Sequence, residues 1–157
     1  MIYHEGKRLP TVTDDAIRGF FGDYRWLSNF HLSYLTVDGL TFPSAEHAYQ
    51  AMKVPLADRQ IFVECSTPGK AKRLGSSVEL PSDWNARRVA AMAKVLRAKF
   101  VQSSELRALL LATDSRYLEE TNDWKDCFWG VDPKFGGANK LGELLMILRS
   151  LLRTSLF

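Results

Sequence analysis

The longest stretch with apolar residues at helical spacing predicts an amphipathic helix over residues 83–101. Its apolar positions follow the i, i+3, i+4, i+7 spacing of one helical face. They are Val89, Met92, Ala93, Leu96 and Phe100. The same spacing predicts a last helix over 140–153, whose apolar face carries Leu141, Leu144, Leu145, Leu148 and Leu152. With a further helix expected over 104–112, the second half of the chain is predicted to be mainly helical.

A tight turn is predicted at Asp38-Gly39, because this pair readily takes the positive φ angles of a two-residue hairpin. We expect strands at about 34–37 and 40–42 on either side of it. Ser44 then provides a helix N-cap, and a helix over about 45–53 is expected to end before a proline.

Shorter elements complete the predicted fold. A helical segment is expected at 57–64, and Thr67-Pro68 begins a short basic helix that Gly75 is expected to close. The segments RYLEE and DCFWGV are interpreted as short strands or extended loops and PKFGGAN as a loop, whereas residues 1–19 carry no clear period. We therefore expect a mostly helical α+β fold with a small antiparallel sheet near the N-terminal third.

Length and composition fit one globular domain over residues 1–157. Of the 157 residues, 46% are hydrophobic and 25% charged, and no apolar run exceeds five residues, so no membrane span is expected.

Two cysteines without paired spacing, and an N-terminus without the apolar region of a signal peptide, favour the cytoplasm. The three histidines are scattered, so no metal site is expected. The net charge of +3 tolerates phosphate without establishing nucleic-acid binding.

The helix after the hairpin carries the first candidate site. Glu46, Gln50 and Lys53 are spaced i, i+4, i+7 and therefore line one helical face. A carboxylate and an amine two turns apart can act together on one substrate, the acid moving protons and the amine binding a phosphate or attacking a sugar carbonyl. The simpler alternative is that the acid and the base suit the helix dipole.

Two residues of the long helix are further candidates. Trp84 can stack on a flat heterocycle, and Lys99 can neutralise a phosphate. The alternatives are an ordinary core tryptophan and a lysine that extends its amine from an apolar stripe to solvent.

The segment DCFWGVDPKFGGAN gathers an acid, aromatic side chains and glycines before the last helix. Asp126, Trp129, Gly130 and Asn139 are its candidates, because glycines let the backbone approach a ligand and the first N–H groups of a helix bind phosphate or ribose oxygens. The alternative is a turn followed by a helix cap.

Several blocks occur together in one order: FFGDYRWLSNF, DGLTFPSAEHAYQAMK, a tryptophan before a helix that ends in LRAKF, LLLAT, LEE and FWGVDPKFGGANKLGELLMILR. This ordered set resembles the NADAR family, also called YbiA-like, with a core over about 20–153. The resemblance implies a compact α+β fold and hydrolysis of N-glycosidic bonds. Family members cleave ribosylated intermediates of riboflavin biosynthesis, and others remove ADP-ribose from guanine in nucleic acid.

The resemblance also assigns site residues. Glu46 is the acid of the family's S-x-E-H motif, Lys53 closes that helix, and Trp84, Asp126 and Trp129 fall on active-site positions. The departures are an alanine before Glu46 and Val131-Asp132-Pro133 in a stretch that is often glycine-rich.

These assignments agree with the chemistry of an N-glycoside, whose departing nitrogen needs a proton while positive charge builds on C1. Glu46 is expected to be the acid or base, supported by Asp126, with Lys53 or Lys99 on phosphate. We expect the substrate to be bound by Ser28, Asn29, Trp84, Trp129, Gly130 and Asn139. A sharper hypothesis is that Lys53 attacks the opened sugar at C1 and forms a Schiff base. No cofactor or metal is needed.

Three functions stay open at this point. The first is an N-glycosidase for small phosphoribosyl intermediates, and the second removes ADP-ribose from guanine in DNA or RNA. Basic residues at Lys70, Lys72, Arg73 and Arg87-Arg88 favour the second. The third is a module that binds an ADP-ribosyl ligand without turnover, against which the presence of both Glu46 and Lys53 argues. The sequence leaves the oligomeric state open.

Overall fold

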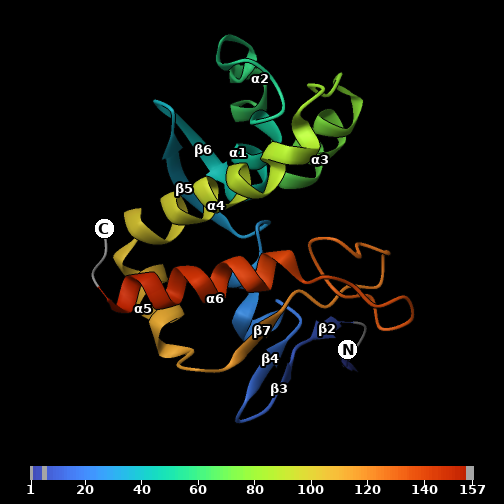
Figure 1. Ribbon diagram of the computed structural model, residues 1–157, viewed down its shortest axis with the longest axis vertical. Helices are drawn as coiled ribbons and strands as arrows, with labels where there is room; N and C mark the ends of the chain where they lie inside the picture. Colours follow the sequence, from blue (N-terminus) through green and yellow to red (C-terminus); the bar gives the residue numbers. More distant parts are fainter. Residues whose placement is uncertain (1, 5–6, 155–157) are drawn as a thin grey trace. The chain divides into compact units, whose positions relative to one another are not determined.

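In the computed structural model, which describes residues 2–4 and 7–154, the chain divides into two compact units (Figure 1). The central unit holds Asn29–Ser104. The second unit holds Met1–Ser28 together with Glu105–Phe157. The expected α+β class is confirmed, because helices dominate and the sheets are small. The single domain over 1–157 stays a prediction.

The predicted hairpin is present in the central unit. Strands β5 (Leu32–Val37) and β6 (Leu40–Ser44) pair antiparallel, and Asp38 and Gly39 between them have φ of 52° and 81°. The pair Leu35 and Phe42 is buried, so one face of the hairpin joins the core of the unit. The tight turn with positive φ angles follows from the residue pair, as expected.

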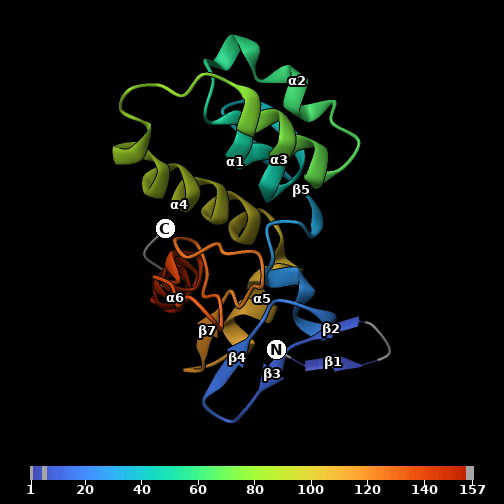
Figure 2. The ribbon, with the colours of Figure 1, turned by 90° about the vertical axis from the view of Figure 1, so that its right-hand side faces the viewer.

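Helices make up the rest of this unit. They are α1 (Ala45–Ala51), the 3₁₀ turn η2 (Leu56–Asp58), α2 (Gln60–Val63), α3 (Pro68–Ser77) and α4 (Trp84–Gln102). Of these, α1, α2 and α4 contact the hairpin. Ser44 caps α1 as predicted, because its Oγ accepts the N–H of His47, and Thr67 caps α3 in the same way. The segment expected at 57–64 is split into η2 and α2. Figure 2 shows α1 and α3 lying side by side.

Two helix boundaries in this unit differ from the prediction. Gly75 does not close α3, which continues to Ser77 with Gly75 buried inside it. The cap position of α4 is Asp83 rather than Ser82. The buried face of α4 includes Met92, Leu96 and Phe100 of the predicted stripe.

The second unit contains strands that the sequence pattern did not reveal. Strand β1 (Ile2–His4) pairs with β2 (Lys7–Leu9), and β3 (Thr11–Val12) pairs antiparallel with β4 (Ala16–Arg18). Strand β4 also pairs in parallel with β7 (Tyr117–Glu119), which lies within the predicted segment RYLEE. Strands of two or three residues are too short to show an alternating period, so this sheet was missed.

Helices complete the second unit: η1 (Gly22–Leu27), α5 (Ser104–Ala112) and α6 (Lys140–Arg153). Helix α6 packs closely on β7, because a Cβ at Gly142 would overlap the carbonyl oxygen of Leu118. Leu141, Leu145, Leu148 and Leu152 of the predicted apolar face are buried. Within the described residues, no helix is long and apolar enough to cross a membrane.

Candidate active site

Helix α1 carries the acid and the amide of the predicted site at buried positions. Every residue from Ala45 to Ala51 is buried. The helix begins where the side chain of Ser44 accepts the N–H of His47 and the carbonyl oxygen of Asn29 accepts the N–H of Glu46 at 3.0 Å. The start of the helix, and with it the position of Glu46, is therefore fixed by the chain that precedes it.

Glu46 and Gln50 form a buried hydrogen-bonded pair on α1. The Nε2 of Gln50 donates to Oε1 of Glu46 at 2.7 Å, and both side chains are at least nine-tenths buried. A carboxylate held away from bulk water with a fixed donor has a defined orientation and can exchange a proton with a bound substrate. The predicted shared face of Glu46 and Gln50 is confirmed.

Lys53 lies one turn further, just after α1 ends. Its Nζ donates to the carbonyl oxygen of Gly75 at 2.9 Å. Burial lowers the pKa of the Lys53 amine from its ordinary value of 10.5, the charge of Glu46 raises it, and the charge of Lys72 lowers it again. The charge of Glu46 favours the protonated amine, but burial outweighs it. The neutral, nucleophilic form of Lys53 is therefore easier to reach than that of a solvated lysine.

Trp84 joins this group from the start of α4. Its ring lies 5.7 Å from that of Tyr49, at 46°, and the guanidinium carbon of Arg87 lies 5.9 Å from the Trp84 ring. The indole is buried and packs beside α1 through its contact with Tyr49. Whether it stacks on a heterocycle stays a prediction.

Asn29 and Lys99 are the remaining predicted residues of the central unit. Asn29 is buried; its Nδ2 contacts Sδ of Met92 at 3.3 Å, and its Oδ1 has no hydrogen-bond partner in the described part of the chain. Such a buried acceptor is costly unless a ligand hydroxyl or amide pairs with it. Lys99 is only 1% exposed, with its Nζ 5.1 Å from the ring of Phe100, so its amine does not extend to solvent.

The other five predicted residues belong to the second unit, where Asp126 organises its own loop. Its Oδ1 accepts the N–H groups of Phe128 and Trp129 at 3.2 and 2.9 Å. Asn122, which the sequence analysis did not single out, is fully buried; its Oδ1 accepts the N–H groups of Trp124 and Asp126, and its Nδ2 donates to the carbonyl of Asp126. The one signal for Asn122 in the sequence is its position shortly before the candidate segment DCFWGV.

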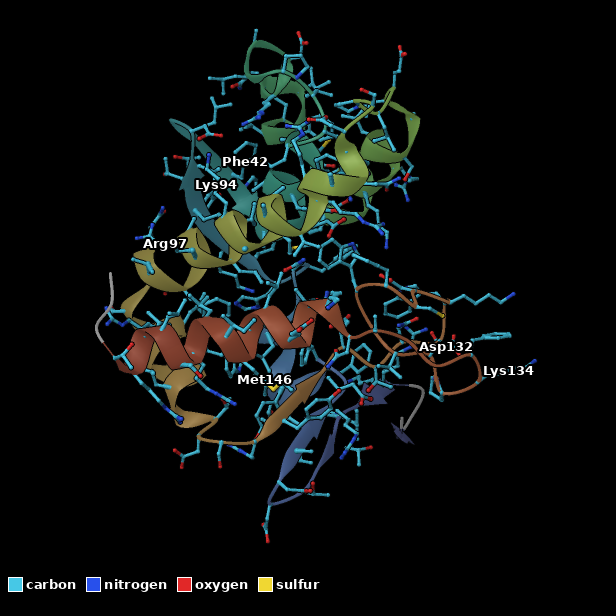
Figure 3. All side chains as sticks on the ribbon, in the orientation of Figure 1. Phe42, Lys94, Arg97, Asp132, Lys134 and Met146 are labelled. Carbon is cyan, nitrogen blue, oxygen red and sulfur yellow. The ribbon has the colours of Figure 1, made fainter. Side chains whose placement is uncertain are left out.

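The first two N–H groups of α6 are already bonded within the protein, whereas the position of the helix start suggested that they could bind a ligand. The amides of Lys140 and Leu141 donate to the carbonyls of Phe128 and Trp129, at 3.1 and 3.0 Å. The loop that precedes the helix therefore caps it with its own backbone. Figure 3 shows Asp132 and Lys134 on this loop.

Asn139 and Gly130 hold this loop against β7. The Asn139 side chain accepts the N–H of Glu120 at 3.0 Å and donates to Tyr117 Oη and the carbonyl of Leu118, both at 2.9 Å. A Cβ at Gly130 would overlap the carbonyl oxygen of Glu120. Both residues have a packing role, and their substrate contacts stay predictions.

Ser28 and Trp129 complete the predicted set. Ser28 is buried at the end of η1, where its N–H donates to the carbonyl of Arg25. Trp129 is half-buried and packs edge-on against Phe128, with ring centroids 4.9 Å apart. Their substrate contacts also stay predictions.

His47 has a structural environment. Its Nε2 donates to the carbonyl of Cys65 at 3.0 Å, so its Nδ1 accepts from Oγ of Ser44 at 2.7 Å. Burial lowers its pKa, so the ring is held neutral. Among residues 2–4 and 7–154, no three His, Cys, Asp or Glu side chains are grouped so that they could hold a metal ion.

Comparison with known proteins gives consistent matches over most of the chain. A family model described as the NADAR domain matches residues 19–153. The N-glycosidase YbiA of Escherichia coli K12 is 40% identical over 149 residues, which cover 91% of this chain and 92% of that protein. A riboflavin biosynthesis protein of Vibrio vulnificus is 36% identical over 132 residues, 81% of this chain and 35% of that protein. The NMR structure of E. coli YbiA superposes with a TM-score of 0.81 at 39% identity, covering 92% of this chain and 89% of that one.

Proposed function

Because the chain belongs to the NADAR domain family, we propose that it is an N-glycosidase that hydrolyses the C1–N bond between a phosphorylated ribose and a base-like group. The observation that carries this proposal is the buried, hydrogen-bonded pair of Glu46 and Gln50, followed along the chain by the Lys53 amine, which is bonded to the carbonyl oxygen of Gly75. An oriented acid and an amine of lowered pKa are the two groups that this reaction uses.

The proposed substrate is a ribosylamino-pyrimidine phosphate, of the kind formed in riboflavin biosynthesis. Support comes from the relatives, one named an N-glycosidase and another a riboflavin biosynthesis protein. Asn29 suits a ribose hydroxyl, because its buried Oδ1 lacks a donor in the described chain. Lys72 is exposed on α3 and acts electrostatically on Lys53, so it suits the phosphate. We place the reaction in the cytoplasm.

The proposed chemistry uses Glu46 as the proton donor and Lys53 as the nucleophile. Opening of the sugar ring breaks the bond between C1 and the ring oxygen, which takes a proton, and forms a C1–N double bond to the base. The neutral amine of Lys53 adds to C1 of this imine, and its own proton passes to the base nitrogen. The base nitrogen takes a second proton from Glu46 and leaves, so that C1 is joined to Lys53 as a Schiff base. Water then adds to the C1–N double bond of the Schiff base, releases the sugar phosphate as an aldehyde and returns the amine. Asp126, Trp129, Lys99, Ser28, Gly130 and Asn139 enter the proposal as supporting or binding residues.

The experiment offers purified protein the ribosylamino-pyrimidine phosphate and follows ribose 5-phosphate by mass spectrometry. Release of the sugar phosphate is expected. Borohydride added during turnover should reduce the Schiff base and leave a mass increase on the peptide that contains Lys53. Turnover without any adduct would remove Lys53 from the nucleophile's role but leave the hydrolase assignment intact.

A second candidate is removal of ADP-ribose from guanine in nucleic acid. The observation that favours it is the exposed basic face of α3, formed by Lys70, Lys72 and Arg73 in the same unit as Glu46. Phosphate contacts release counterions, so affinity for a modified DNA strand should fall steeply with salt. A free nucleotide should show a much shallower dependence, and the same mass-spectrometric assay on guanine-modified single-stranded DNA compares the two.

A further inference from the structure

Gly75 lies inside α3, the helix that packs against α1 (Figure 2), and it faces Gln50 of α1. A Cβ at this position would overlap Oε1 of Gln50 and lie 2.8 and 3.0 Å from its Cδ and Cβ. Real Cβ atoms do not approach other heavy atoms this closely, so the Gln50 side chain occupies the space that any other residue at 75 would need. The glycine therefore serves the approach of a side chain rather than a turn.

The Gln50 side chain that fills this space also holds the acid. Its Nε2 donates to Oε1 of Glu46 at 2.7 Å, while its other amide atom faces Gly75. Both partners are buried, so water does not replace this donor if the amide moves. The absence of a side chain on α3 thus sets the orientation of the carboxylate on α1.

Gly75 also holds the amine, through its backbone. Its carbonyl oxygen accepts from Nζ of Lys53 at 2.9 Å. Helix α3 ends at Ser77, so this carbonyl is one of the last-turn acceptors without an intrahelical donor. A cation is also favoured near the C-terminus of a helix. The same residue contacts the amide that orients Glu46 and the amine of Lys53.

We propose that Gly75 and Gln50 are positioning residues that set the acid and the amine of the active site relative to one another. Gly75 acts on Glu46 through Gln50 and on Lys53 through its carbonyl oxygen. The inference rests on the proposed hydrolase, and it goes further by placing the control of both groups on a second helix, which supplies neither the acid nor the amine.

The first test is a double-mutant cycle at these two positions. Gly75→Ala should lower kcat by about a hundredfold, because Gln50 is displaced from Glu46. Gln50→Ala should lower kcat by about tenfold, because Glu46 loses one donor. The combined variant should turn over close to Gln50→Ala alone, because Oε1 and Cδ of Gln50 are then absent and only the Cβ of residue 50, 3.0 Å from the new methyl group, remains. The proposal would be overturned if the fold-losses of kcat in the two single variants multiplied in the double variant, or if Gly75→Ala kept the kcat of the wild type.

A matched control comes from the same helix. A Cβ at Gly69 would meet only Oγ1 of Thr67, at 3.9 Å, so Gly69→Ala tests the effect of alanine on α3 without the overlap. This variant should keep wild-type kcat and KM. A loss equal to that of Gly75→Ala would assign the effect to the helix in general and overturn the proposal.

A second readout separates positioning from packing. Gln50→Met keeps an unbranched side chain of similar length but removes the donor, so the charged form of Glu46 loses a stabilising hydrogen bond. Because Glu46 is the proposed proton donor, its ionisation sets the basic limb of the pH–rate profile. This limb should move to higher pH, with the thermal midpoint little changed. Lys53 and Lys72 are unchanged in this variant. An unshifted limb would overturn the role of Gln50.

The carboxyl NMR signal of Glu46, followed against pH without substrate, distinguishes failure of the inference from failure of the proposed function. A titration at higher pH in Gln50→Met supports the positioning role even if no N-glycoside tested is hydrolysed. Identical titrations in the two proteins overturn that role even if the wild type is an active hydrolase.

Discussion

The Nζ of Lys53 donates a 2.9 Å hydrogen bond to the carbonyl oxygen of Gly75, in the last turn of α3. This contact gives the lysine a structural task, the capping of a helix C-terminus, besides its proposed role as nucleophile. The two roles require different properties of the side chain. Capping needs a cation of sufficient reach, whereas attack on a sugar carbon needs an amine that can lose its proton.

Lys53→Arg is expected to separate these roles. Arginine keeps a cation near the end of α3, so the free energy of unfolding should stay within about 1 kcal/mol of wild type. A guanidinium does not lose its proton in proteins, so turnover and the borohydride adduct should both disappear. Thermal unfolding and the mass-spectrometric assay measure the two effects. Retained turnover in Lys53→Arg would contradict a Schiff base at this residue.

Glu46→Gln is expected to abolish hydrolysis and preserve the fold. The new amide is nearly isosteric, and its oxygen can still accept the N–H of Gln50, but it cannot transfer a proton. We expect kcat to fall by about a hundredfold to ten-thousandfold. The control is Glu64→Gln just after α2, where Gln60 donates to Glu64 across the same four-residue spacing at the surface. Unfolding of Glu46→Gln would mean that the acid is structural.

The sequence predicted the elements whose patterns are local and long enough to recognise. Asp38-Gly39 determined the hairpin, Ser44 and Thr67 determined two helix starts, and the stripes of α4 and α6 predicted their buried faces. The strands β1 to β4 were not predicted, because each has only two or three residues. Moreover, β4 pairs with β7, about a hundred residues along the chain.

Around helix α1, the sequence indicated which side chains share a face but not most of the contacts that they make. Helical spacing placed Glu46 beside Gln50, and a hydrogen bond joins them as that spacing allows. Gly75 was expected to end a helix, because glycine usually does so, and only the packing of α1 on α3 reveals its use. Likewise, nothing in the sequence indicates that the loop carbonyls of Phe128 and Trp129 occupy the first N–H groups of α6.

The stability of the central unit should fall in weak acid because of His47. Burial lowers the folded-state pKa of this ring from its ordinary value of 6.5, so the unfolded chain binds a proton more readily. The free energy of unfolding should therefore decrease as pH falls below 6.5, until the folded-state value is passed. His47→Gln keeps a donor for the carbonyl of Cys65 and should flatten this dependence. Urea denaturation at several pH values tests it, and equal slopes would contradict the prediction.

Asp132 should stabilise the loop before α6 in a pH-dependent manner. The N–H of Lys134 lowers the pKa of this carboxyl most, and the N–H groups of Lys125 and Phe135 act in the same direction. This stability is present above the ordinary value of 3.8 and is lost as pH falls through the folded-state value. In Asp132→Asn, the side-chain NH2 group takes the place of the oxygen that accepts the N–H of Lys125, so two donors face each other. The variant should therefore have a lower thermal midpoint at pH 7. The midpoints of the two proteins should converge in acid; a constant difference would contradict the prediction.

Asn29 and Asn122 are both buried asparagines, but they should respond differently to replacement by alanine. Asn122 makes three hydrogen bonds to its own loop, so Asn122→Ala should lower the free energy of unfolding by about 3 kcal/mol. Among the described residues, the Asn29 side chain has only the sulfur of Met92 as a partner and its Oδ1 has no donor, while the backbone bond to Glu46 survives substitution. Asn29→Ala should therefore cost about 1 kcal/mol or less. If Oδ1 binds a ribose hydroxyl, the same change should raise KM about tenfold. Chemical denaturation and steady-state kinetics measure both, and an unchanged KM would remove Asn29 from the binding site.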